Sequence, residues 1–258
     1  MQTWQLGSLV FFGYVAIVAV LPRGMRPARQ ASALAGAAFG AGMIGLSRFL
    51  SADGIANVWL LPPAALLIGY WTSGLLFVAP MPRAERMLAA LDGHLRIREV
   101  SARMPRPVVE LLEFAYAGIY PLIPLALYIA LGQGISANRF WATILLTDYI
   151  CFGMLPWFQT RPPRAVGLDA VWRSSWRTVN LRMLSAGSVQ VNTFPSGHAA
   201  EALACALLVS GGPPLVAGSM FVAAAAIAAG TVFGRYHYAA DAIAGWAVAL
   251  LVWGSLRS

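Results

Sequence analysis

Residues 214–234, PLVAGSMFVAAAAIAAGTVFG, form an apolar run without one charged side chain. About 20 such residues are what a helix needs to cross the hydrocarbon core of a bilayer. Similar apolar runs occupy about 5–21, 31–50, 57–80, 108–132, 138–158, 197–212 and 237–256. The sequence therefore predicts an all-α fold, a polytopic membrane helix bundle of about eight transmembrane helices.

The composition excludes most other classes of protein. Of the 258 residues, 59% are hydrophobic and only 11% are charged, whereas a soluble domain has about 25% charged residues. Soluble, disordered and disulfide-rich secreted proteins are all poor fits. Cys151 and Cys205 both lie inside apolar runs and predict neither a disulfide framework nor a metal site.

Two polar segments interrupt the apolar runs. Residues 81–107 have six arginines, and Met87, Leu88, Leu91 and Leu95 recur there at helical spacing. This pattern indicates an amphipathic helix on the membrane surface, or else a solvated loop helix. Residues 159–197 have five arginines, with two tryptophans four residues apart at 172 and 176. That spacing predicts a short interfacial helix.

All eighteen basic residues are arginines, and the net charge is +8. Nucleic acid is not an expected partner, because these arginines cluster between apolar runs and not on a soluble face. They are expected either to contact membrane lipid headgroups or phosphate, or only to mark the topology of the chain.

Three polar clusters contain the residue types of a reactive site. They are Thr160-Arg161-Pro162-Pro163-Arg164, residues 192–199 (NTFPSGHA) and residues 234–241 (GRYHYAAD). The first two share one loop, and the third follows after two predicted spans. An even number of crossings returns the chain to the same face, so all three clusters are expected on one side of the membrane.

The first property of these clusters is the capacity to bind an anion. Ser196 and Gly197 open an apolar helix, where free backbone N–H groups and the positive end of the helix dipole favour negative charge. Arg161, Arg164 and Arg235 add forked donors that suit phosphate oxygens. These five residues are the predicted phosphate-binding set.

The second property is acid–base and nucleophilic chemistry. His237 and Asp241 are four residues apart, a spacing that places them on one helix face, where a carboxylate can orient the imidazole. His198 supplies a second imidazole as acid or base. One histidine attacking phosphorus while the other protonates the leaving oxygen is phosphoryl-transfer chemistry without a cofactor. Two histidines and an aspartate can also hold zinc, but the nearby arginines disfavour a cation, so we expect no metal.

Phe194-Pro195-Ser196-Gly197-His198, followed by a pair of spans and then His237-Tyr238-x-x-Asp241, resembles the second and third motifs of the type 2 phosphatidic acid phosphatase superfamily. The resemblance covers about residues 57–256. It implies that His237 is the nucleophile, Asp241 its partner and His198 the acid for the leaving alcohol. It also implies a six-helix catalytic core at 57–258, preceded by an added pair of helices at 1–56.

The sequence departs from that family's pattern at two positions. Met154 stands where the first motif has a lysine, and Thr231 stands where the third has an arginine. Arg164 and Arg235 are the candidate substitutes. Thr231 and the Pro-Pro-Arg run are similar to a divergent branch that includes inositol phosphorylceramide synthases.

The expected function is an integral membrane phosphatase that hydrolyses a phosphomonoester or pyrophosphate of a lipid through a phosphohistidine. The alternatives are a lipid phosphotransferase, which passes the group to a lipid hydroxyl, and a non-enzymatic lipid transporter or scaffold. Glu201, one helical turn after His198, either tunes that histidine or hydrogen-bonds to a neighbouring helix.

The arginines also predict an orientation in a multi-pass cell-membrane protein. With eight spans, fifteen of the eighteen arginines fall on one side, in 22–31, 81–107, 159–197 and at Arg235. Because basic loops stay in the cytoplasm, the catalytic loops are expected there.

Overall fold

The computed structural model describes residues 1–257, and within them it contains helices but no strand. The α-helices are α1 (Thr3–Val20), α2 (Pro27–Ser47), α3 (Leu61–Gly74), α4 (Pro82–His94), α5 (Ile97–Ala102), α6 (Arg106–Ala117), α7 (Ile119–Gly132), α8 (Ala137–Gly153), α9 (Ser175–Gly187), α10 (Gly197–Leu208), α11 (Pro214–Phe233) and α12 (Ala239–Ser255). A π-helical turn (Ala56–Leu60) and a 3₁₀ turn (Pro163–Val166) complete the elements. The predicted all-α class is confirmed.

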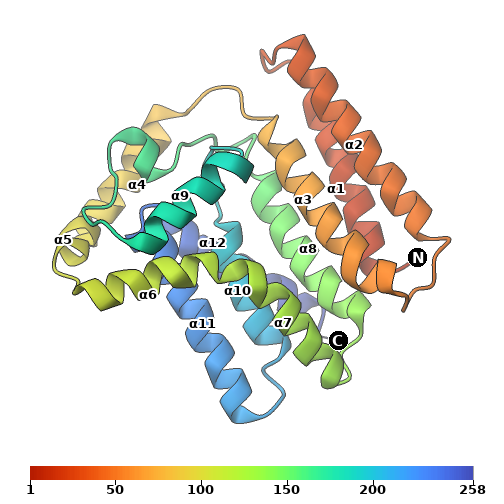
Figure 1. Ribbon diagram of the computed structural model, residues 1–258. Coiled ribbons are helices and arrows are strands. Elements are labelled where there is room, and N and C mark those ends of the chain that lie inside the picture. The colour runs from red at the N-terminus through yellow and green to blue at the C-terminus, as the bar shows by residue number, and fades with distance from the viewer. Residues whose placement is uncertain (258) are drawn as a thin grey trace.

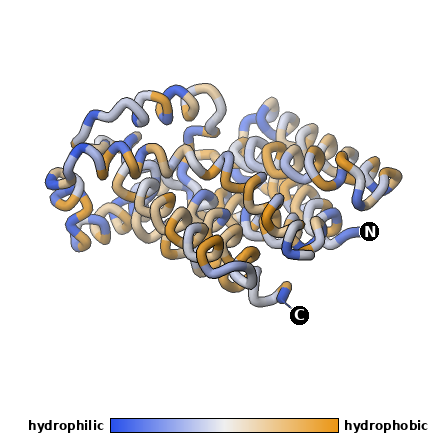
Figure 2. Tube along the Cα trace, turned by 60° about the horizontal axis from the view of Figure 1, so that its bottom comes forward, coloured by the Kyte–Doolittle hydropathy of each residue, from blue (hydrophilic) through white to orange (hydrophobic). Residues whose placement is uncertain are grey.

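Helix α10 lies at the centre of the bundle and packs against α7, α8, α11 and α12 (Figure 1). The first three helices form a group on one flank, where α1 contacts both α2 and α8. Coloured by hydropathy, the long helices are mostly apolar, and polar residues gather at helix ends and in the connections (Figure 2). The polar clusters therefore lie at the ends of an apolar bundle.

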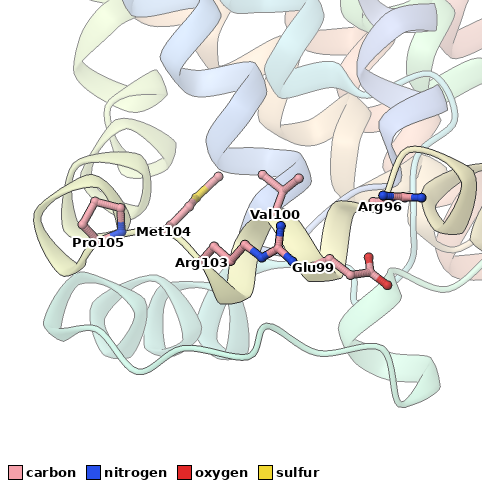
Figure 3. A pocket seen from close by; sticks show the side chains of 6 residues that line it. All are labelled: Arg96, Glu99, Val100, Arg103, Met104 and Pro105. Carbon is pink, nitrogen blue, oxygen red and sulfur yellow. The ribbon is translucent and has the colours of Figure 1, made fainter.

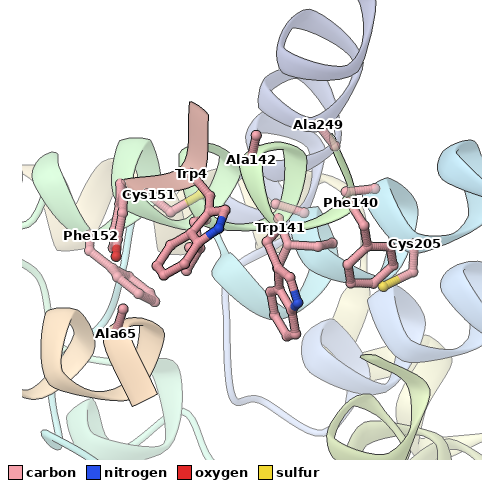
Figure 4. Close-up of a cluster of buried hydrophobic side chains, with 14 of the residues drawn as sticks. Trp4, Ala65, Phe140, Trp141, Ala142, Cys151, Phe152, Cys205 and Ala249 are labelled. Carbon is pink, nitrogen blue, oxygen red and sulfur yellow. The ribbon is translucent and has the colours of Figure 1, made fainter. Parts of the chain in front are cut away.

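The Ala- and Gly-rich helix α2 packs closely against its neighbours. A Cβ atom at Gly40 would lie 2.4 Å from the ring of Phe12, and one at Gly36 would lie 2.7 Å from the hydroxyl of Thr72. Small residues of this kind let membrane helices approach each other. Larger side chains from α1, α8 and α10 fill the interior beside them, among them Trp4, Phe140 and Trp141 (Figure 4).

Two helices, α1 and α11, are long and apolar enough to cross a membrane by themselves. The predicted fourth span is instead a pair, α6 and α7, bent by 61° at the break between them. Pro121 and Pro124 follow Gly118 in this region, and neither proline can donate a backbone hydrogen bond to the preceding turn. The count of eight transmembrane helices remains a prediction.

The third predicted span also begins irregularly. Pro62 and Pro63 lie in the first turn of α3. Proline is tolerated there because the first turn has no intrahelical acceptor for its N–H.

The segment 81–107 forms α4, α5 and the start of α6. On α4 the acidic residues Glu85 and Asp92 are buried, whereas Met87 and Leu91 are exposed. Of the predicted apolar stripe, Met87, Leu91 and Leu95 face away from the protein, as expected of a helix on a membrane surface, whereas Leu88 is buried against it. The predicted interfacial helix is α9, which starts at Ser175 and so leaves Trp172 outside it.

Candidate active site

The structure brings the three polar clusters together. Thr160 and Asn192 form an isolated antiparallel bridge, which joins the first cluster to the second. The backbone N–H of Ser196 donates to the carbonyl of Asp241 at 2.9 Å, which joins the second to the third. The backbone N–H of Arg164 donates to the carbonyl of Arg235 at 3.2 Å and joins the first to the third.

The second cluster forms the N-terminus of α10. Ser196 is the N-cap, and its hydroxyl accepts a hydrogen bond from the backbone N–H of Ala199 at 3.4 Å. Helix α12 approaches this turn so closely that a Cβ atom at Gly245 would lie 2.5 Å from the Ser196 carbonyl oxygen. Glycine at 245 is therefore required for the N-terminus of α10 to reach the third cluster.

His237 and Asp241 are paired, but not as two residues on one helix face. His237 precedes Tyr238, the N-cap of α12, and its Nδ1 lies 3.4 Å from the Asp241 Oδ2. The same oxygen accepts hydrogen bonds from the backbone N–H of Tyr238 and the side-chain amide of Asn192, each at 2.9 Å. Asp241 thus both caps the helix and orients the imidazole. The prediction that the two residues share one helix face is wrong, because His237 precedes the helix and Asp241 reaches it from the helix cap.

His198 faces His237 at 6.2 Å between ring centroids. Its ring stacks on Tyr116 with centroids 5.1 Å apart and planes within 3°. Tyr116 in turn stacks on Tyr236 at 3.9 Å. No residue in 1–257 accepts or donates a hydrogen bond at the buried Nε2 of His198. The imidazole is therefore oriented by stacking, and one of its nitrogens is left for another group.

The three predicted phosphate-binding arginines occupy different surroundings. Arg164 lines a cavity of about 600 Å³ that both histidines also line, and its guanidinium lies 5.6 Å from the centre of the Tyr236 ring. Partial burial lowers its pKa. Arg161 and Arg235 do not line this cavity, and each is paired with a carboxylate of α4.

Those carboxylates are site residues that the sequence analysis did not identify. Glu85 accepts two hydrogen bonds from the Arg161 guanidinium, at 2.9 and 2.8 Å, and these hold the pKa of Glu85 below its usual value. Asp92 accepts from Arg235 at 2.6 Å and from the backbone N–H of Ala239 at 2.9 Å. Burial raises the pKa of Asp92 although Arg235 opposes the shift. Glu85 and Asp92 are seven residues apart and so lie on one face of α4, and this spacing was the sequence feature from which they could have been identified.

A third buried carboxylate anchors the tyrosines beside the histidines. Glu113 of α6 accepts hydrogen bonds from Arg177, from the Tyr236 hydroxyl and from Asn180. This network ties α6 and α9 to the third cluster, so Tyr236 has a set position against Tyr116.

The cavity itself is largely apolar away from the histidines. Its wall is formed by α3, α7 and the residues around them, including Trp59, Leu66, Leu67, Trp71, Ile123 and Leu127. Among residues 1–257, no three His, Cys, Asp or Glu side chains come together in a metal-binding arrangement. A second hollow, about 590 Å³ beside α5, is lined by Arg96, Glu99 and Arg103 and contains neither histidine (Figure 3).

The sequence was also compared with known proteins, and a match covers the part of the chain that contains the three polar clusters. No curated protein and no solved structure matches it. A family model described as the PAP2 superfamily matches residues 83–255, from α4 to α12. The match begins later than the resemblance at 57–256 and leaves the proposed division at residue 56 as a prediction. Because the match covers about two thirds of the chain and includes all three polar clusters, this protein belongs to the PAP2 superfamily.

Proposed function

We propose that the protein is a membrane phosphatase that hydrolyses a phosphomonoester or pyrophosphate of a lipid at the cavity between His198 and His237. One observation supports this most directly: the two imidazoles face each other at 6.2 Å beside Arg164 in a cavity with an apolar wall.

In the first step, the Nε2 of His237 attacks phosphorus and the bond to the leaving oxygen breaks. Asp241 holds the Nδ1 proton of His237 and stabilises the positive charge that forms on the ring. His198 gives its proton to the leaving alcohol. The second step reverses these roles, because His198 takes a proton from water, which attacks phosphorus and releases inorganic phosphate from His237.

In this proposal, phosphate oxygens are bound by Arg164 and by the N-terminus of α10 at Gly197, both of which line the cavity. Ser196 is fully buried outside the cavity wall, and as the N-cap it holds this turn in place. Arg161 and Arg235 do not bind phosphate in this proposal but hold the catalytic loops in position, since both guanidiniums are paired with α4 carboxylates outside the cavity. Arg235 adopts a positive φ of 61°, and its link to Asp92 holds that turn directly before His237.

The phosphotransferase alternative shares the first step and differs only in the acceptor. Thr231, which stands where an arginine is expected, accepts the backbone N–H groups of Tyr236 and His237 at its carbonyl and is fully buried. It therefore shapes the third cluster without reaching substrate, and its presence is compatible with either acceptor.

The test is a phosphate-release assay with purified protein over a panel of lipid phosphates and pyrophosphates, with and without an added lipid alcohol. Release without alcohol supports hydrolysis, and product formed only with alcohol supports transfer. Activity is expected to survive EDTA and to be inhibited by vanadate, whose five-coordinate form resembles phosphorus under attack. Full function of the His237→Ala protein would instead favour a transporter or scaffold.

We also propose that the catalytic loops face the cytoplasm, on the basis of the arginine distribution. The exposed Arg173, between the first cluster and α9, is a suitable reporter position. An Arg173→Cys protein with Cys151 and Cys205 replaced should resist an impermeant maleimide in intact cells and react after permeabilisation. Labelling in intact cells would place the loops outside.

A further inference from the structure

Two carboxyl groups in the cavity have no role in the chemistry described above. Asp148 comes from α8 and is fully buried, and Glu201 comes from α10 and is 6% exposed. Both belong to the wall of the cavity that holds His198 and His237. The two carboxyl groups lie next to each other in this wall.

Both side-chain oxygens of Asp148 are buried and have no hydrogen-bond partner within residues 1–257. No cationic side chain in these residues forms an ion pair with Asp148 or Glu201. The other buried carboxylates near the site differ, since Glu85, Asp92 and Glu113 are each paired with an arginine. Burying a polar group without donors costs free energy, and a ligand in the cavity that supplies donors would remove that cost.

The position of the pair indicates which part of a substrate it meets. Glu201 follows His198 by three residues on α10, or roughly 4.5 Å along the helix axis. The phosphate-binding turn lies at the other side of His198, at Ser196 and Gly197. Since His198 protonates the leaving oxygen in the proposed mechanism, Glu201 lies beside the alcohol part of the substrate and away from its phosphate.

The chemistry of the cavity favours a hydroxyl group over an ammonium group as the donor. The cavity already holds the Arg164 guanidinium and the imidazole of His198, which must be protonated to act as an acid. A further cation there would be repelled, whereas a hydroxyl is neutral and donates to a carboxylate.

We propose that Glu201, held by Asp148, binds a free hydroxyl on the alcohol part of the substrate, so that the enzyme prefers phosphoesters of polyols such as a glycerol with an unesterified hydroxyl. This inference rests on the proposed phosphatase function. Both residues line the cavity, but only Glu201 has exposed surface, so Glu201 makes the contact and the fully buried Asp148 is a positioning residue.

The test compares two substrates that differ by one oxygen: a 1-acylglycerol 3-phosphate and its analogue without the central hydroxyl, with the same acyl chain. We expect the wild-type kcat/KM to be at least about tenfold higher for the hydroxyl substrate, because a hydrogen bond to a charged group is worth about 1.5–3 kcal/mol. In Glu201→Leu this ratio should fall to about one, and in Glu201→Gln, which keeps the size of the side chain, it should fall partway. An analogue with an amino group in place of the hydroxyl forms the third arm.

A matched control is Thr147→Val, which removes a buried, unpartnered hydroxyl next to Asp148 that does not line the cavity. Its substrate ratio should equal that of the wild type. Misfolding lowers turnover of both substrates together, so the ratio separates binding from folding. Equal turnover of the two substrates by the wild type, an unchanged ratio in Glu201→Leu, or a preference for the amino analogue would overturn the hydroxyl site alone. Release of phosphate from none of them would overturn the phosphatase function as well.

Discussion

The turn before α12 and the wall of the cavity both hold buried carboxyl groups, but only those at the turn have cationic partners. Asp92 pairs with Arg235, with side chains 4% and 7% exposed, whereas both oxygens of Asp148 are buried without a hydrogen-bond partner within residues 1–257. The difference shows that buried carboxyl groups occur in two settings in this protein. A carboxylate paired with an arginine holds a loop in place, whereas a carboxyl group without a cationic partner faces the cavity.

The arginines divide in the same way. Arg161 and Arg235 are joined to α4, and Arg164 has only a carbonyl contact at 3.4 Å and an aromatic ring. An arginine free of carboxylates retains its donors for phosphate. This contrast is the reason why we propose Arg164 as the phosphate-binding arginine.

The largest effect is expected at the nucleophile. His237→Ala should lower phosphate release to below about 1% of wild type, because loss of a nucleophile typically costs several powers of ten. His94→Ala, on the exposed side of α4, is the matched control and should keep full activity. Residual activity above that level in a folded His237→Ala protein would remove His237 from the nucleophile position. His198→Ala should spare substrates with good leaving groups, since it removes only the acid.

The next effect tests the paired carboxylates. Asp92→Ala leaves Arg235 buried without its partner, so we expect a loss of about 3–5 kcal/mol in the free energy of unfolding. Unfolding by denaturant in detergent measures this loss. Glu99→Ala, an exposed acid on α5, should change stability by less than about 0.5 kcal/mol. If Asp92→Ala changed the free energy of unfolding as little as Glu99→Ala, the carboxylates paired with arginine would not be stabilising the fold.

A third measurement compares two arginines. Arg164→Ala should lower kcat by about 10²–10³, the usual result of removing one donor to a developing charge. Arg161→Ala should lower it far less, because its guanidinium is bound by Glu85 and is 43% exposed. The reverse order would reassign phosphate binding to Arg161 and leave Arg164 as a packing residue against Tyr236.

The smallest effect concerns pH. Arg161 lowers the pKa of Glu85 below its ordinary 4.5, so this pair stabilises the fold above that pH and ceases to do so as pH falls through the lowered value. Wild type should therefore melt at a higher temperature than Glu85→Gln at neutral pH, and the gap should close in acid. The gap should be modest because solvent screens the exposed guanidinium. A gap that is constant with pH would mean that Glu85 acts through packing alone.

Much of the site was predictable because its residues are close in sequence. Ser196, Gly197 and His198 belong to one helix start, and counting spans was enough to place three clusters on one side. The pairing of His237 with Asp241 was predicted for a different reason from the one observed. The helix begins only after His237, so the carboxylate reaches the imidazole as part of the helix cap.

What could not be predicted depends on contacts between distant parts of the chain. Asp92 and Arg235 are 143 residues apart, and Glu85 and Arg161 are 76 apart. No local periodicity relates such positions. The bend of 61° between α6 and α7 was also not predicted, since the sequence predicts a single span at 108–132.

The sequence by itself determined the apolar, helical character of this protein, its three polar clusters and its membership of the PAP2 superfamily, because composition, helical period and motif spacing are local properties. Only the tertiary structure decided which charges are satisfied. Whether a buried arginine or carboxylate is structural or available to a ligand depends on the partner that packing brings within hydrogen-bond distance. Helix α4 supplies that partner for Arg161 and Arg235, whereas no residue of 1–257 supplies one for Asp148.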